Sequence, residues 1–132
     1  MELRDKERLV VDALEDVKGR DIAVFDTARL PSMFERVVIA SGDSNRHVKA
    51  LAERVRERIR DSGGRVYGVE GERGGEWVLV DLGDMVVHVM HPTVREFYNL
   101  EEIWGGRTVK LKKEEKPKAK KRAKAPRRRA RR

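Results

Sequence analysis

Two segments of the chain carry apolar residues at three- and four-residue intervals, which is the spacing of a helix with one buried face. In residues 4–18 these apolar positions are Leu9, Val10, Ala13, Leu14 and Val17. Gly19 follows and favours the end of a helix. In the second segment Ser44 is a suitable cap, and the apolar stripe is Val48, Leu51, Ala52, Val55 and Ile59. The pattern predicts two amphipathic helices, the second of which ends before Gly63.

Five shorter runs are rich in β-branched residues and are bounded by turn-forming residues, which indicates strands. They occupy residues 22–26, 36–40, 65–70, 77–82 and 85–90. Pro31 separates the first two runs, and a glycine-rich turn at residues 71–75 precedes the fourth. The order of helices and strands predicts an α/β domain with a mixed sheet of about five strands and helices packed on it.

A short helix is expected at residues 93–100, directly after Pro92. The large apolar residues in and after this helix include Phe97, Ile103 and Trp104. Their spacing suits packing of a helix on a sheet, so we expect them to belong to the core rather than to a functional site.

Gly83 and Asp84 form the shortest connection between two predicted strands. Glycine at the first position of a two-residue loop tolerates the positive φ that a tight hairpin needs. Pairing Leu82 with Met85 fixes the register, and one face of the hairpin then carries only Val78, Val80, Val87 and Val89. The opposite face carries Trp77, Leu79, Asp81, Val86, His88 and Met90.

This second face mixes aromatic, aliphatic and polar side chains, which is typical of a protein-binding surface with an apolar centre and a polar edge. We expect helices to cover the uniformly apolar face and to leave the mixed face partly exposed to a partner. The alternative is that a helix or the C-terminal segment covers the mixed face as well.

The net charge of +8 is unevenly distributed along the chain. Residues 112–132 contain 13 Lys or Arg against two acidic residues, a net charge of +11, whereas residues 1–111 carry 18 against 21, or −3. Apart from two prolines, the basic segment has no apolar residue larger than alanine. It therefore predicts a disordered tail after one folded domain at residues 1–111. Its charge favours contacts with RNA phosphates, and a tail that only raises solubility is the alternative.

The chain has no cysteine, which excludes disulfides, thiolate nucleophiles and zinc sites with sulfur ligands. No run approaches the roughly 18 consecutive apolar residues that a membrane span requires, and the start of the chain is charged. We expect a cytoplasmic protein with no membrane partner.

Two sequence blocks resemble the signature of the ribosomal silencing factors, also called the Iojap family. They are residues 75–84, Gly-Glu-Trp-Val-Leu-Val-Asp-Leu-Gly-Asp, and residues 86–92, Val-Val-His-Val-Met-His-Pro. Residues 41–52 and 95–104 are similar to the family's strand-to-helix segment and to its closing segment. The likeness covers about residues 5–107 and leaves the basic tail outside. The departures from the family's usual pattern are Leu82, His47 and residues 34–37.

The resemblance implies a nucleotidyltransferase-like fold and a factor that is not an enzyme. Such a factor binds the large ribosomal subunit through ribosomal protein fourteen, blocks joining with the small subunit and represses translation when nutrients are scarce. The family's contact surface includes the sheet face that bears the signature tryptophan, which matches Trp77. Self-association as a homodimer through an exposed apolar face is a further expectation.

The alternative function is a nucleotidyltransferase-like enzyme that binds phosphate. Residues 41–44 lie where a helix amino end attracts anions, but a cap and a turn explain them equally. Asp81 and Asp84 are the nearby candidates to hold a metal, and a hairpin turn separates them. His88 and His91 lie on opposite faces of a strand and are poor joint ligands. We expect no catalysis, cofactor or metal, a partner contact for His88, and a strand-ending role for His91.

Overall fold

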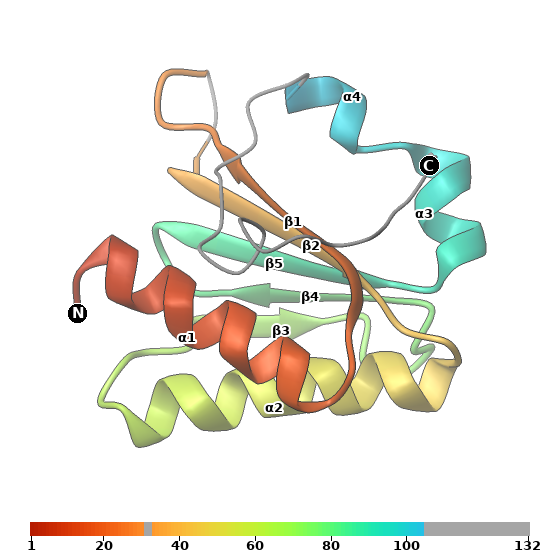
Figure 1. Ribbon diagram of the computed structural model, residues 1–132, viewed down its shortest axis with the longest axis horizontal. Coiled ribbons are helices and arrows are strands. Elements are labelled where there is room, and N and C mark those ends of the chain that lie inside the picture. Colours follow the sequence, from red (N-terminus) through yellow and green to blue (C-terminus); the bar gives the residue numbers. More distant parts are fainter. Residues whose placement is uncertain (31–32, 105–132) are drawn as a thin grey trace, which may run out of the picture.

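The computed structural model describes residues 1–30 and 33–104, and Figure 1 shows the arrangement of its helices and strands. The strands are β1 (Arg20–Asp26), β2 (Arg36–Ser41), β3 (Gly68–Glu70), β4 (Trp77–Asp81) and β5 (Met85–Met90). They form one five-stranded sheet in the order β1-β2-β5-β4-β3. β2 and β5 are parallel and the other neighbours are antiparallel, which confirms the predicted mixed sheet.

Two long helices, α1 (Leu3–Asp16) and α2 (Asn45–Asp61), pack together on one side of the sheet (Figure 1). Ser44 caps α2 as predicted, because its hydroxyl accepts a hydrogen bond of 3.1 Å from the backbone N–H of His47. The predicted apolar stripe of α2 is wholly buried: Val48, Leu51, Ala52, Val55 and Ile59. No helix in the described ranges is long and apolar enough to cross a membrane.

Two short helices, α3 (Pro92–Tyr98) and α4 (Glu101–Trp104), lie on the opposite side of the sheet (Figure 1). Val94 of α3 and Leu100 pack against a second, smaller buried cluster. This cluster consists of Phe25, Val37, Ile39, Val86 and Met90. Both faces of the sheet therefore have a core, but the second one is small and only partly covered by helix.

The structure corrects the prediction for the residues after β5. The side chains of Phe97 and Ile103 are 78% and 66% exposed, so the expected packing of these two residues in the core is wrong. In α3 the positions turned to the sheet are those of Val94 and Arg95, and a helical period of about 3.6 residues then directs Phe97 away from the sheet. The side chain of Trp104 and the basic tail lie outside the described part of the chain. The third strand is also shorter than the predicted residues 65–70.

Candidate protein-binding surface

The β4–β5 hairpin has the predicted register, and its two faces differ as the sequence indicated. The helix-covered face pairs Val78 with Val89 and Val80 with Val87, and all of these side chains are buried. The other face pairs Trp77 with Met90, Leu79 with His88 and Asp81 with Val86. At the turn Gly83 has a φ of 95°, a conformation that favours glycine.

A buried lysine fixes the turn of this hairpin to α1. Lys6 is 8% exposed, and its Nζ donates to the carbonyl of Leu82 at 3.0 Å and to Oδ1 of Asp84 at 2.6 Å. Asp81 accepts a hydrogen bond of 2.9 Å from the backbone N–H of Gly83, which stabilises the turn locally. The hairpin is therefore held in one position relative to the helical layer.

The six residues predicted to bind a partner are not equally accessible. Trp77, Leu79, Asp81 and His88 are partly buried, which leaves each of them some surface for a contact. Val86 and Met90 are 2% and 0% exposed, because they belong to the second core cluster beneath Val94 and Leu100. The prediction that these two residues are exposed is therefore wrong. They are covered, as the alternative prediction for this face of the hairpin stated.

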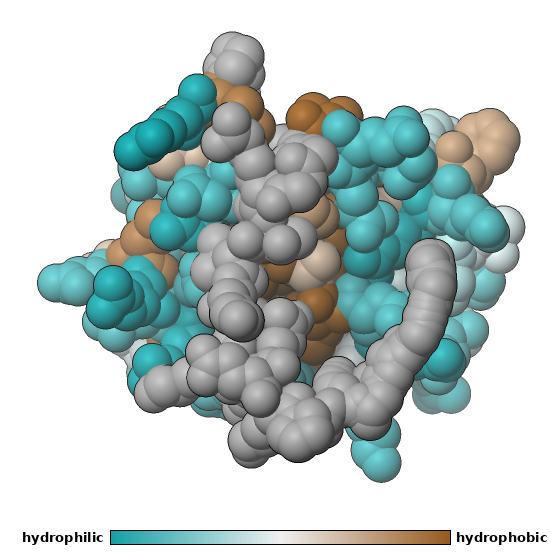
Figure 2. Space-filling model, turned by 45° about the horizontal axis from the view of Figure 1, so that its top comes forward, coloured by the Kyte–Doolittle hydropathy of each residue, from teal (hydrophilic) through white to brown (hydrophobic). Residues whose placement is uncertain are grey.

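Trp77 lies at the junction of the hairpin and α3. Its indole Nε1 donates to Nδ1 of His88 at 3.0 Å, and its ring centroid is 5.0 Å from that of Tyr98. Phe97 in turn makes an edge contact with Tyr98, with ring centroids 5.0 Å apart. Figure 2 turns the α3–α4 side of the molecule towards the viewer and shows apolar residues near the middle of this face, with hydrophilic residues around them.

The electrostatics of this surface favour a neutral imidazole at His88. Burial lowers the pKa of His88 from 6.5 to about 4. The hydrogen bond from Trp77 requires a free lone pair on Nδ1, which agrees with the neutral form. Around neutral pH the surface therefore presents an uncharged Trp77–His88 pair.

Arg95 positions α3 and α4 over the edge of the sheet. Its guanidinium donates to both carboxylate oxygens of Glu101, at 3.1 and 2.9 Å. It also donates to Oγ of Ser41 at 2.9 Å and to the carbonyl of Asp21 at 2.7 Å. One side chain thus connects both short helices to β1 and β2, which fixes the place of Tyr98 beside Trp77.

Sequence reasoning did not assign Tyr98 or Arg95 to the surface. For Tyr98 the sequence did contain a signal. Val94 lies four residues before it, and this interval places both residues on the same face of a helix. The role of Arg95 had no such signal, because its partners Glu101, Ser41 and Asp21 are brought together only by the folded chain.

The amino end of α2, where a phosphate site was the alternative, has polar groups that contact one another. Asp43 accepts from Arg20 at 2.7 Å, and its backbone N–H donates to Nδ1 of His47 at 2.8 Å. Nε2 of the same imidazole lies 2.6 Å from the carbonyl oxygen of Val17, which ties the helix start to the end of α1. These are the contacts of a helix cap and the turn that precedes it, which is the structural explanation that the sequence offered for residues 41–44.

The candidate metal ligands have similar structural partners. Asp84 pairs with Lys6, and Nδ1 of His91 accepts from the backbone N–H of Thr93 at 3.3 Å at the start of α3. Among the residues that the structure describes, no three His, Asp or Glu side chains are grouped to hold an ion.

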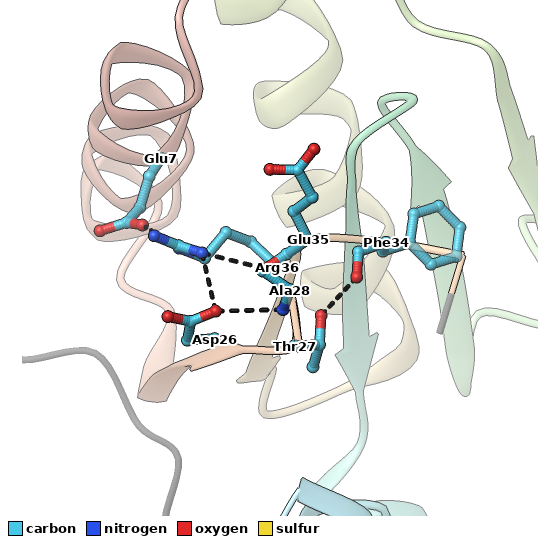
Figure 3. A network of polar contacts seen from close by, with 7 residues as sticks. All are labelled: Glu7, Asp26, Thr27, Ala28, Phe34, Glu35 and Arg36. Atoms are coloured by element: carbon cyan, nitrogen blue, oxygen red, sulfur yellow. Dashed lines mark hydrogen bonds and ion pairs between the residues drawn. The ribbon is translucent and has the colours of Figure 1, made fainter. Parts of the chain in front are cut away.

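A further polar network joins α1 to β1 and β2 (Figure 3). Arg36 donates to Oε1 of Glu7 at 3.2 Å and to Oδ1 of Asp26 at 3.0 Å. Thr27 closes the connection between the two strands by donating to the carbonyl of Phe34 at 2.6 Å. Because one guanidinium engages the carboxylates of both Glu7 and Asp26, the network stabilises this edge of the sheet.

The fold and this surface define an α/β protein with two long helices on one side of a mixed sheet, and two short helices and an aromatic surface on the other. A family model described as "Ribosomal silencing factor during starvation" matches residues 1–132. The ribosomal silencing factor RsfS of Chromobacterium violaceum is 52% identical over 106 residues, which are 80% of this chain and 87% of that protein. The chain belongs to the ribosomal silencing factor, or Iojap-like, family.

Two further relatives extend the comparison. A crystal structure of a Chromobacterium violaceum protein aligns with a TM-score of 0.79 at 49% identity, covering 85% of this chain and 93% of that one. The mouse protein named "Mitochondrial assembly of ribosomal large subunit protein 1" is 31% identical over 99 residues, which are 73% of this chain and 43% of that protein. Family membership gives the chain a role in ribosome-linked regulation of translation.

Proposed function

We propose that this chain binds the large ribosomal subunit through ribosomal protein fourteen and thereby prevents joining of the small subunit. Translation is repressed as a result. The partner contacts Trp77, Leu79, Asp81 and His88 directly, and Val86 and Met90 support this surface from below.

The observation that carries the proposal is the position of Trp77. The indole is only partly buried, and it is held by a hydrogen bond to His88 and by a ring contact with Tyr98. Large aromatic side chains that are fixed in place but accessible are common energetic centres of protein interfaces. The name of the mouse relative refers to the large ribosomal subunit, which supports the choice of subunit.

The proposal assigns the chain no catalytic activity. The carboxylates of Asp81 and Asp84 are engaged by the hairpin turn and by Lys6, and phosphoryl transfer needs carboxylates that hold metal ions. Full-length protein with nucleoside triphosphates and magnesium should show no more turnover than a variant in which Asp81 and Asp84 are both alanine. A clear difference between them would favour the enzyme.

Co-sedimentation of the full chain with isolated large and small subunits tests the proposed function. We expect binding to large subunits only, and inhibition of subunit joining in a light-scattering assay. Binding that disappears when large subunits are stripped of protein fourteen, and returns when it is added back, identifies the partner. Binding to neither subunit, or equal binding to both, contradicts the proposal.

A further inference from the structure

Large apolar side chains are exposed on α3 and α4 to an extent that the core does not explain. Phe97 is 78% exposed, Tyr98 55% and Ile103 66%. Elsewhere in the described residues the exposed large apolar side chains are Met1, Met33 and Tyr67, which are far apart along the chain. Scattered single residues of this kind are ordinary, but a concentration on one pair of short helices marks an interaction surface.

Two of these side chains, Phe97 and Tyr98, are continuous with the surface around Trp77. Tyr98 contacts Phe97 on one side and Trp77 on the other, with ring centroids 5.0 Å apart in both pairs. The row of three rings therefore runs from the exposed side of α3 to the first residue of β4. A partner that contacts Trp77 from the open side of the sheet also reaches Phe97.

The row is held in place before any partner binds. Arg95 lies one turn before Tyr98, and its contacts with Glu101, Ser41 and Asp21 fix α3 against the sheet. The side chain of Arg95 is only 12% exposed, and its bonds to Glu101 and Ser41 are partly shielded from water. A surface that is already ordered loses less conformational entropy on binding.

Two acidic residues adjoin the exposed apolar side chains along the chain, since Glu96 precedes Phe97 and Glu102 precedes Ile103. Glu96 and Glu102 are exposed, and neither has an ion-pair partner among the described residues. The third carboxylate of this segment, Glu101, is neutralised by Arg95. Within the described part of the chain, the aromatic strip is thus followed along the sequence by two exposed carboxylates that form no ion pair.

We propose that Phe97 and Tyr98 extend the Trp77 surface and dock an apolar patch of a protein that is bordered by Lys and Arg. This inference rests on the proposed function and adds α3 to its binding site. Acidic residues repel nucleic-acid phosphates, which disfavours RNA as the occupant. In a two-fold contact between copies of this chain the same carboxylates would approach one another, which disfavours a second copy.

The test compares two surface changes with two matched controls in the full chain. Phe97→Ala removes the most exposed ring, and Glu96→Lys with Glu102→Lys reverses the two acidic charges. Tyr67→Ala removes an exposed ring near Gly83, outside the row, and Asp61→Lys reverses an exposed charge at the end of α2. Binding to isolated large subunits, the thermal melting temperature and sedimentation equilibrium are measured for each.

We expect Phe97→Ala to weaken large-subunit binding about tenfold, and the charge reversal to weaken it with a slower association rate. Melting temperatures should stay near that of the unchanged chain, because these side chains are exposed. Both controls should bind normally. Wild-type binding by the Phe97→Ala variant overturns the inference but leaves the proposed function intact.

Three other outcomes overturn the inference in different ways. If Phe97→Ala only converts a dimer to a monomer, the occupant is a second copy. If the charge reversal strengthens binding to large subunits and to protein-free ribosomal RNA, the occupant is RNA. If the unchanged chain binds no large subunits, the proposed function fails and this inference fails with it.

Discussion

The indole Nε1 of Trp77 donates a hydrogen bond of 3.0 Å to Nδ1 of His88 on the neighbouring strand. The two residues are diagonal neighbours, since Trp77 lies opposite Met90 and His88 lies opposite Leu79. The bond orients the indole and requires that Nδ1 of the imidazole carry no proton. The geometry of the aromatic surface therefore depends on the protonation state of one histidine.

We predict that mild acid destabilises the fold through His88. The pKa of this residue is lowered from 6.5 to about 4, so between these values the unfolded chain binds a proton that the folded chain does not. This difference in proton binding costs no stability above pH 6.5. As the pH falls to about 4, it lowers the free energy of unfolding by about 3 kcal/mol. Denaturant unfolding at a series of pH values measures it.

The control for this prediction is a pair of histidine variants. His88→Gln removes the titrating group and should flatten the fall in stability across this pH window. His91→Gln alters a histidine at the start of α3 and should keep most of the fall. Equal pH dependence in His88→Gln and the unchanged chain would show that other groups are responsible.

Trp77→Ala should affect binding more than stability. Truncating a central interface aromatic commonly costs about 2–4 kcal/mol of binding, which is a loss of affinity of some 30-fold or more. The indole is only partly buried, so the loss of folding stability should stay below the about 3–5 kcal/mol of a fully buried aromatic. Thermal melts and large-subunit co-sedimentation measure the two effects. A variant that melts far lower, or that binds as well as the unchanged chain, contradicts the surface assignment.

Arg95 and Glu101 should be strongly coupled. Their side chains are 12% and 34% exposed and share two hydrogen bonds, so a double-mutant cycle with Arg95→Met and Glu101→Gln should give about 1–2 kcal/mol. Arg54 and Glu57 on α2 form an exposed pair with 39% and 49% exposure, and the same cycle there should give a clearly smaller coupling energy, because water screens exposed ion pairs. Similar coupling in the two pairs would mean that α3 is not held by this contact.

The basic tail should change the salt dependence of ribosome binding. Residues 112–132 carry a net charge of +11, and contacts between cations and RNA phosphates weaken steeply as salt rises. A chain that ends at Leu111 should still bind large subunits, with a shallower decline in affinity as salt is raised. Equal salt slopes for the two chains would leave the tail a role in solubility only.

The sequence alone determined the helical layer and the register of the hairpin. The stripe from Val48 to Ile59 is buried as predicted, because a helical period leaves only one way to place those side chains against a sheet. The pairing of Leu79 with His88 follows from the two-residue turn at Gly83, since a slip by one residue would turn the valines away from the helices. Both features depend on neighbours that are close along the chain.

Only the tertiary structure decided which residues of the second face remain accessible. Val86 and Met90 are covered because Val94 and Leu100 pack on the second core cluster, and the hairpin pattern contains no information about that packing. Phe97 was expected in the core and is exposed, because Arg95 takes the inner position through contacts with Asp21 and Ser41. These contacts join residues more than fifty positions apart, where local periodicity has no influence and side-chain packing and hydrogen bonding decide.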